Sequence, residues 1–283
     1  MRYYRPISSG DIFYSVDKVR FKFELNLRQA RFLFSLVSDM NYEFFESFKS
    51  FQYKNLFSIK TFDGLNSFSL GVGYNGSTAL DKNHCFIEFN PNKVGLDKNF
   101  LKIISFLNLN VFKFDLSLYD IAVDVPYNKK FVSLVKDRRL YKKFVYDCVG
   151  SNVTEYLGTS ADSGRVKLYN KTIESGLAYD LTRLELTTNC IDYLVVLKQF
   201  PQLLVCGDFD LLASTKLCKT DYVLLQLLWQ SDSPSFYYKQ LGRDKQEKLK
   251  PFIVSNFDLG FSEDVFSSLL DIIDFFRTRR NFE

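Results

Sequence analysis

The sequence contains a single histidine and a single tryptophan among its 283 residues. A metal site built from several histidines is therefore excluded by count. The five cysteines are widely spaced and include no Cys-x-x-Cys pair, so they indicate neither a disulfide framework nor a zinc site. Free cysteines of this kind are typical of a protein in a reducing cytoplasm.

Long apolar runs are also absent from the sequence. No run approaches the roughly 18 apolar residues that a membrane helix needs, and the first residues lack the apolar core of a signal peptide. The formal net charge is +4, a mild excess that permits a nucleic-acid partner without demanding one. We therefore expect a soluble cytoplasmic protein without membrane contact, in which any nucleic-acid signal is local.

The hydrophobic pattern predicts a mixed α+β fold: a twisted, mainly antiparallel sheet with covering helices, followed by a helical C-terminal part. The length allows one large domain or two modest ones. Strands are expected at residues 12–16, 19–25, 55–62, 66–73, 84–89, 111–125 and 141–148, and helices at residues 27–52, 96–108 and 128–138.

The pattern changes near residue 188. Helical spacing of apolar residues follows in four segments, at residues 191–204, 209–213, 222–229 and 264–276. We interpret residues 1–188 as a catalytic domain and residues 189–283 as a helical DNA-recognition part.

A short segment around Tyr169 carries the clearest chemical signal. With the strand period of two, Arg165, Lys167, Tyr169 and Lys171 share one face, and the apolar residues between them face the core. The next alternation, residues 182–187, places Arg183, Glu185 and Thr187 outward on what we expect to be the adjacent antiparallel strand. The pattern therefore indicates a phenol surrounded by cations, with a carboxylate one strand away.

These residues resemble the active-site block of a known family. The sequence Tyr-Leu-Gly-Thr-Ser-Ala-Asp-Ser-Gly-Arg-Val-Lys-Leu-Tyr-Asn-Lys at 156–171, followed by Thr-Arg-Leu-Glu-Leu at 182–186, is similar to the trans-acting Rep initiators (Rep_trans) of Gram-positive rolling-circle plasmids. Two upstream segments, at 86–93 and 118–124, fit the same family in order and spacing. The family includes related relaxases of conjugative elements.

The resemblance implies an enzyme that nicks and closes DNA at a specific origin. It places the nucleophile on Tyr169, which would form a 5′-phosphotyrosyl bond and release a 3′-hydroxyl. It also implies a homodimer, a recruited host helicase and the double-strand origin DNA of a plasmid or mobile element as partners.

A tyrosine nucleophile needs help at neutral pH. A phenol titrates near a pKa of ~10, and a close cation lowers a pKa by on the order of 1–3 units, so the hydroxyl would remain mostly protonated. A base or a metal-ordered geometry must assist the attack. The cations Arg165, Lys167, Lys171 and Arg183 would offset the charge on the phosphate or simply position it.

Carboxylates are the metal ligands that the composition leaves, and hard oxygen ligands favour Mg²⁺ or Mn²⁺. The candidates are Glu88, Asp120, Asp124 and Glu185. The two aspartates share a strand face but lie about 13 Å apart along an uninterrupted strand, too far to hold one ion together. One of them paired across the sheet with a glutamate is the better combination, because neighbouring strands lie about 5 Å apart. The single histidine, His84, is expected to be structural or solvent-facing.

The C-terminal part contains a stretch that interleaves aromatics with cations. Lys239, Arg243 and Lys245 are candidate DNA contacts, although a solvated helix face would have the same composition. The sequence leaves three functions open: a rolling-circle initiator, a conjugative relaxase with the same chemistry, and a non-catalytic origin-binding or regulatory protein.

Overall fold

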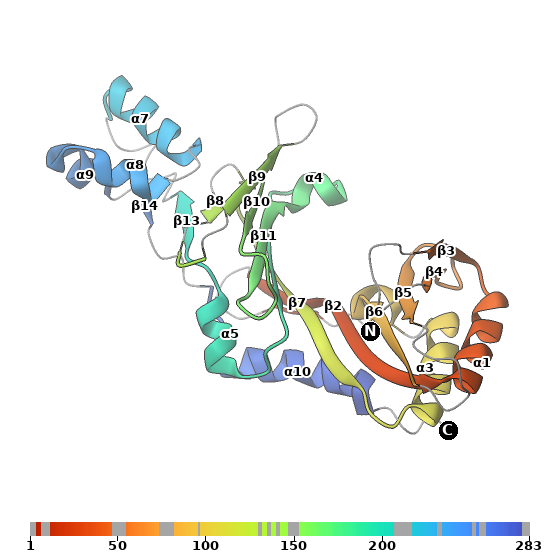
Figure 1. Ribbon diagram of the computed structural model, residues 1–283. Coiled ribbons are helices and arrows are strands. Elements are labelled where there is room, and N and C mark those ends of the chain that lie inside the picture. Colours follow the sequence, from red (N-terminus) through yellow and green to blue (C-terminus); the bar gives the residue numbers. More distant parts are fainter. Residues whose placement is uncertain are drawn as a thin grey trace. The chain divides into compact units, whose positions relative to one another are not determined.

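The computed structural model describes residues 4–6, 12–46, 55–73, 82–95, 97–129, 132–134, 137–139, 142–146, 153–206, 217–230, 234–250, 253–254 and 259–278. Within these residues the chain is a mixed structure with a large antiparallel sheet, and its C-terminal part is mainly helical (Figure 1). The predicted fold class is confirmed. No helix in these residues is both long and apolar enough to cross a bilayer.

The chain forms two compact units, each drawn from segments that are far apart in the sequence. The first comprises Met1–Tyr4, Ser15–Ile121 and Asp264–Glu283, and the second comprises Arg5–Tyr14 and Ala122–Glu263. The long strand β7 (Asp115–Val125) passes from the first unit to the second. The predicted division near residue 188, between a catalytic domain and a helical DNA-recognition part, stays a prediction.

The first unit is a sheet with helices packed on it. Strand order in this part of the sheet is β3-β4-β5-β6-β2, continued by the first half of β7, and the strands from β3 to β2 pair antiparallel. Its further elements are β2 (Phe13–Asn26), α1 (Leu27–Ser38), β3 (Tyr42–Glu46), β4 (Asn55–Lys60), β5 (Ser67–Val72), β6 (Lys82–Phe89), α2 (Pro91–Val94), α3 (Lys98–Asn110) and α10 (Glu263–Thr278).

Two predictions in this unit are wrong. The expected pair of strands over residues 12–25 is one continuous strand, β2. Val16 is buried and the next two residues are half-buried, so the alternation changes phase without a turn. The expected helix over residues 27–52 ends at Ser38, because Tyr42–Glu46 leaves the helical pattern and pairs with β4. Phenylalanine-rich sequence suits a strand as well as a helix.

Helix α1 begins where the sequence supplies a complete cap. The Asn26 side chain accepts a hydrogen bond from the Gln29 amide at 2.8 Å, and the Gln29 side chain accepts one from the Asn26 amide at 2.9 Å. This capping box satisfies two amides at the helix start. The Gln29 amide group also donates to the Asn110 carbonyl at the end of α3, which ties the two helices together.

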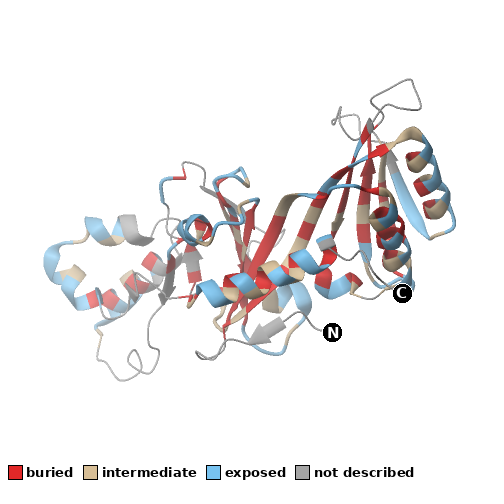
Figure 2. Ribbon diagram, turned by 90° about the horizontal axis from the view of Figure 1, so that it is seen from below, coloured by how far each residue is buried: buried red, intermediate tan, exposed pale blue. Residues whose placement is uncertain are grey.

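Aromatic side chains pack together in the core of the first unit, among many buried aliphatic residues. The rings of Phe89 and Phe100 lie 4.7 Å apart, and Phe276 of α10 packs on both at 4.9 and 5.9 Å. Figure 2 shows buried positions along the strands of this unit and exposed positions on the outer faces of α1 and α3. A segment near the C-terminus therefore completes a core begun by the first hundred residues.

The second unit contains the remaining strands of the large sheet in the order β7-β12-β11-β10-β9, and a small sheet in the order β14-β13-β8. Its elements are β8 (Val132–Leu134), β9 (Lys142–Tyr146), β10 (Val153–Leu157), β11 (Arg165–Asn170), α4 (Lys171–Ser175), β12 (Thr182–Thr188), α5 (Tyr193–Gln199), β13 (Leu203–Cys206), α7 (Lys219–Gln230), α8 (Pro234–Gln240), α9 (Arg243–Leu249) and β14 (Ile253–Val254).

The helix expected over residues 128–138 is wrong, because strand β8 lies there. A buried ion pair holds this segment: Lys129 Nζ lies 2.7 Å from the Glu155 carboxylate and also donates to the Val132 carbonyl. The second oxygen of Glu155 accepts from the Leu134 amide at 3.0 Å. These contacts connect β8 to β10. No local sequence pattern predicts them.

The turn between β10 and β11 depends on Gly164. Its φ of +77° lies in the left-handed region, and a Cβ there would lie 2.7 Å from Cβ of Gln199. The buried Arg139 donates to the carbonyls of Gly164 and Gln199 at 2.9 and 2.7 Å, which holds the turn against α5. The turn sets where β11 begins, and therefore which of its side chains face outward.

Helices α7, α8 and α9 form a small cluster of their own within the second unit (Figure 1). Leu225, Leu228 and Leu249 are its buried centre. The fully buried Asp221 carboxylate accepts from Lys245 and Lys248, which fastens α7 to α9. The mainly helical character of the C-terminal part is thereby confirmed, with two short strands, β13 and β14, added to it.

Candidate active site

Strands β11 and β12 pair antiparallel, as the sequence pattern indicates. Their register sets Lys167 opposite Glu185 and Tyr169 opposite Arg183. The intervening apolar residues Val166, Leu168, Leu184 and Leu186 are fully buried. The two strands therefore place their polar side chains on one face, with the core behind them.

The hydroxyl group of Tyr169 donates a hydrogen bond to the Glu185 carboxylate at 2.6 Å. The second oxygen of Glu185 lies 3.7 Å from Lys167 Nζ, and the same ammonium lies 3.8 Å from the centre of the Tyr169 ring. A carboxylate within hydrogen-bond reach of a phenol is placed to accept its proton. The cation beside both groups would stabilise the negative charge that develops during proton transfer or attack.

The pKa of Tyr169 is raised well above its ordinary value of 10. Burial is the largest cause, followed by the negative charge of Glu185 and the hydrogen bond to it, while Arg183 acts in the opposite direction. The cation Arg183 lowers the pKa as expected, but burial and Glu185 outweigh it, so the net shift is upward. The raised pKa keeps the phenol protonated at neutral pH, so any reaction in which its oxygen acts as a nucleophile would require transfer of this proton.

Arg183 is held by the carboxylate of Asp124 on β7. Arg183 Nε and Nη2 each lie 2.6 Å from one oxygen of Asp124, so the pair is bidentate. Both side chains are largely buried, at 11% and 5% exposure. Such a pair fixes the guanidinium plane beside Tyr169. The sequence pattern indicated a metal-ligand role for Asp124 and not this ion pair, because 59 residues separate the two partners.

The other two predicted phosphate-binding cations lie at the ends of β11. Arg165 is exposed and its guanidinium reaches the Thr187 hydroxyl at 3.4 Å. Lys171 begins α4, pairs with Glu174 and lies 5.9 Å from the Tyr169 ring centre. Arg165 is the first residue of β11 and Lys171 directly follows its last residue, and both fit a role in positioning a DNA backbone.

The predicted metal ligands do not gather at one point. Glu88 is paired with Arg20 at 2.6 Å and Asp120 with Lys18 at 2.7 Å, both in the first unit. One oxygen of the buried Asp120 has no hydrogen-bond partner in the structure. In the second unit, Asp124 binds Arg183, and Glu185 is engaged by Tyr169 and Lys167. Each carboxylate thus already has a cationic partner.

Across the described ranges, no group of three or more histidine, cysteine, aspartate or glutamate side chains is placed to hold a metal ion. Neutralised single carboxylates are a poor donor set for Mg²⁺ or Mn²⁺, which need several oxygen ligands. The residues in this arrangement do not fit the metal, and we derive no step through it. The requirement for a divalent metal stays a prediction.

The predicted DNA contacts of the C-terminal part lie on α8 and α9. Lys239 and Arg243 are exposed. Lys245 instead pairs with Asp221, whose pKa is held below its usual range by hydrogen bonds from Lys245, Lys248 and Cys218. The ammonium group of Lys245 is therefore partly neutralised by Asp221 and is less available to a DNA phosphate than an unpaired lysine would be.

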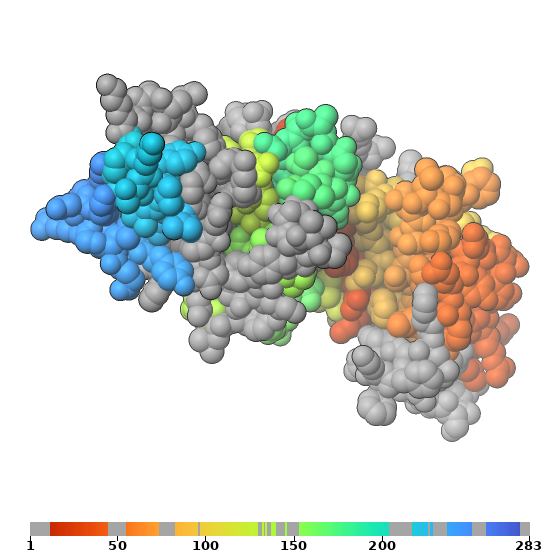
Figure 3. Space-filling view, turned by 90° about the horizontal axis from the view of Figure 1, so that it is seen from above, coloured from red at the N-terminus to blue at the C-terminus, as the bar shows by residue number. Residues whose placement is uncertain are grey.

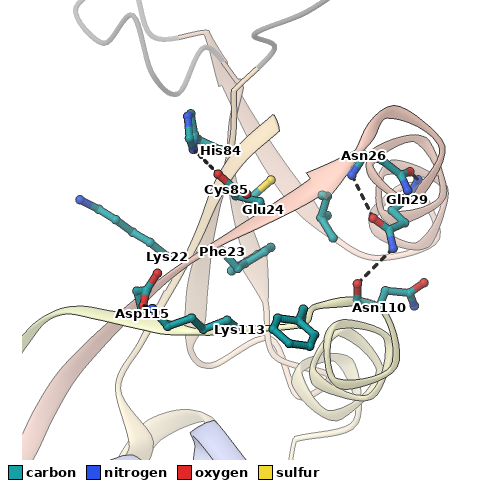
Figure 4. Close-up of a pocket in the computed structure, with 12 residues that line it drawn as sticks. Lys22, Phe23, Glu24, Asn26, Gln29, His84, Cys85, Asn110, Lys113 and Asp115 are labelled. Atoms are coloured by element: carbon teal, nitrogen blue, oxygen red, sulfur yellow. Dashed lines mark hydrogen bonds and ion pairs between the residues drawn. The ribbon is translucent and has the colours of Figure 1, made fainter. Parts of the chain in front are cut away.

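A separate groove of about 720 Å³ lies in the first unit (Figure 4). Its lining includes two lysines and two carboxylates: Lys113 lies 2.7 Å from Asp115, His84 Nδ1 lies 3.6 Å from Glu24, and Lys22 is the second lysine. None of the predicted catalytic or metal-binding residues lines it. His84 is half exposed, and burial raises the pKa of the Cys85 thiol in the lining to about 12, so this thiol is not ionised at neutral pH. With a neutral imidazole, the two lysines and two carboxylates leave no excess of positive charge for DNA.

Comparison with known proteins gives limited information. No family model matches the chain, and no curated protein matches it. A similar solved structure is that of the rolling circle replication initiator protein from Geobacillus stearothermophilus, 12% identical, covering 95% of this chain and 97% of that chain with a TM-score of 0.39. A TM-score of 0.39 does not establish a shared function. Any assignment of function to this chain therefore rests on the residues of the candidate site.

Proposed function

We propose that the chain is an origin-specific DNA nicking and closing enzyme of the rolling-circle type, with Tyr169 as its nucleophile. The 2.6 Å hydrogen bond from the Tyr169 hydroxyl to Glu185 carries the proposal. This bond places the oxygen that would attack, that of Tyr169, next to a proton acceptor, the Glu185 carboxylate. Lys167 and Arg183 lie on the same face of the sheet. The resemblance of residues 156–171 and 182–186 to the Rep_trans family supports the same assignment.

The reaction begins when the Tyr169 oxygen attacks a DNA phosphorus in line. Its proton passes to Glu185, the bond from phosphorus to the 3′ oxygen breaks, and the leaving oxygen takes a proton from water. The products are a 5′-phosphotyrosyl ester and a free 3′-hydroxyl that a polymerase can extend. The ester conserves the energy of the broken bond, so a 3′-hydroxyl can later attack it and rejoin the strand.

The cations have two roles in this proposal. Lys167 and Arg183 flank the reacting atoms, and they offset the charge that develops on the phosphate oxygens. Arg165 and Lys171 hold the DNA backbone on either side. Asp124 is a positioning residue, because it acts through the guanidinium of Arg183.

We further propose that residues 1–188 carry the chemistry and residues 189–283 select the origin, with Lys239 and Arg243 as DNA contacts. A homodimer, a recruited helicase and a plasmid or mobile-element origin belong to the same proposal. A conjugative relaxase would use the same site, and the genes beside this one would separate that alternative from a replication initiator.

The test is the detection of a covalent complex between the protein and DNA. The full chain is incubated with a supercoiled plasmid carrying its own origin and Mg²⁺, and protein attached to DNA is detected after denaturation. Tyr169→Phe should abolish nicking and the adduct while leaving origin binding nearly intact. Tyr156→Phe is the matched control, because Tyr156 lies opposite Lys167 on the next strand and should leave the adduct unchanged.

The outcomes separate the alternatives. Loss of the adduct in Tyr156→Phe, with a normal adduct in Tyr169→Phe, would move the nucleophile to Tyr156. An origin bound without any adduct would favour the non-catalytic origin-binding protein. The same assay in excess EDTA tests the predicted need for Mg²⁺ or Mn²⁺. Full cleavage in EDTA would contradict the requirement for a divalent metal.

A further inference from the structure

The segment that joins β11 to β12 begins two residues after Tyr169 and shows apolar side chains to solvent. Tyr179 is 61% exposed and Ile173 is 57% exposed. Figure 3 shows this segment (green) on the surface of the face seen from above. Exposed apolar side chains are ordinary when scattered, but two on one short connection beside a candidate active site are a candidate contact surface.

The segment is held in place by its own hydrogen bonds. The Thr172 hydroxyl donates to the Tyr179 carbonyl at 2.9 Å and accepts from the Leu181 amide at 2.7 Å. The Lys171 amide donates to the Leu181 carbonyl at 2.9 Å, which closes the loop. Asn128 also donates to the Asp180 carboxylate at 2.8 Å. Exposed side chains on an ordered backbone lose little entropy when they bind a ligand.

The nucleophile beside this segment is recessed. Tyr169 is 5% exposed, whereas the side chains of the neighbouring connection project into solvent. The segment starts close to the phenol, because Lys171 Nζ lies 5.9 Å from the centre of the Tyr169 ring and the next residue, Thr172, bonds the Tyr179 carbonyl. In duplex DNA the base faces are stacked on one another and are not available to side chains. Unpaired bases expose these faces, and they stack on aromatic side chains.

We propose that Tyr179, supported by Ile173, is a stacking surface for an unpaired base next to the scissile phosphate. This inference rests on the proposed function. It identifies Tyr179 as a residue that positions the DNA substrate. A base suits the surface better than a protein partner does, because specific protein interfaces bury on the order of 1,000 Å² or more and this surface comprises two side chains. Lys171 at the start of the segment would hold the adjoining phosphate.

The experiment uses the full chain carrying Tyr169→Phe, so that DNA is bound but not cleaved. The probe is a short single-stranded oligonucleotide with one 2-aminopurine, a base whose fluorescence falls on stacking. Tyr179→Ala should abolish this fluorescence change and weaken single-strand binding by roughly 5- to 150-fold, the range reported for one base–aromatic stack. Tyr179→Phe should retain both, because the ring is kept. Ile173→Ser should have a smaller effect in the same direction.

Phe62→Ala is the matched control, because Phe62 is an aromatic residue of similar exposure, 69%, in the first unit. It should leave the fluorescence change intact. Unaltered binding and fluorescence in Tyr179→Ala would overturn the inference, as would an equal loss for single-stranded and duplex DNA. Unaltered DNA binding with loss of a helper protein would assign the segment to protein docking instead. Failure of the proposed function is distinct, because it shows as a missing adduct in the chain with Tyr169 intact.

Discussion

At the scale of single residues, the hydrogen bond between Tyr169 and Glu185 makes the sharpest prediction. Glu185→Gln keeps the shape of the side chain but cannot take a proton, so the initial rate of adduct formation at pH 7 should fall by about 10²- to 10⁴-fold. The negative charge that helps to raise the Tyr169 pKa is also lost, so that pKa should fall and part of the rate should return at pH 9.

Glu174→Gln is the control for this change. Glu174 pairs with Lys171 and raises the Tyr169 pKa only as the smallest of the causes, without contacting the phenol hydroxyl, so its variant should stay close to the parent rate. A parent rate in Glu185→Gln at pH 7 would show that another group, or a metal-bound hydroxide, accepts the proton.

Asp124 supports a second prediction at this scale. Asp124→Ala leaves the largely buried Arg183 charge without its bidentate partner, which should reduce the free energy of unfolding by about 3–5 kcal/mol. Asp124→Asn keeps one hydrogen-bond acceptor and should lose less. The measurement is the denaturant midpoint of each variant. Parent stability in Asp124→Ala, combined with loss of metal-dependent cleavage, would favour the metal-ligand role that the sequence indicated.

At the scale of elements, the turn before β11 decides which side chains reach the active face. Gly164→Ala puts a side chain in the left-handed region, at a cost of about 1–2 kcal/mol, and adds a clash with Gln199. We expect a lower unfolding temperature and a slower adduct reaction together, because the start of β11 must shift. Circular dichroism melting and the covalent-complex assay measure the two effects.

Gly64→Ala is the matched control for Gly164. Gly64 has a similar φ of +73°, but a Cβ there would meet no atom within 4 Å. It should therefore show the backbone cost alone and keep its adduct rate. Equal losses at both glycines would show that the contact with Gln199 does not set the position of β11.

At the scale of the whole molecule, the prediction concerns the division between chemistry and recognition. Phosphate contacts carry no sequence information, so choice of one origin needs side chains that read base edges. We expect exchange of residues 231–255 for those of a relative with another origin to transfer origin preference without changing nicking of single-stranded DNA. Part of this stretch lies outside the described residues. A chimera that keeps its original preference would place recognition in the sheet.

The structure of the α7–α9 cluster predicts different effects for single substitutions within that stretch. Lys239→Ala and Arg243→Ala should weaken binding to all DNA sequences and flatten its salt dependence, because both side chains are exposed cations. Lys245→Ala should also destabilise the packing of α7 on α9, because it removes a partner of the buried Asp221. Quantitative binding at several salt concentrations and hydrogen exchange of α7 would separate the two effects.

The sequence by itself determined the parts of this protein that depend on near neighbours. Alternation over residues 165–171 and 182–187 fixed the outward faces of β11 and β12, and the short connection between them fixed their antiparallel pairing. The placement of Glu185 one strand from Tyr169 followed from these two local facts. The mixed fold and the mainly helical C-terminal part followed from the same periodicities.

Only the tertiary structure decided the features that depend on distant partners. The ion pair between Asp124 and Arg183 joins strands far apart in the sequence, and a local pattern does not encode which strands become neighbours. Burial set the direction of the Tyr169 pKa, because the cost of removing charge from water depends on surroundings that a strand pattern does not specify. The packing of Phe276 on Phe89 likewise placed α10 in the first unit, although periodicity alone assigned it to the C-terminal part.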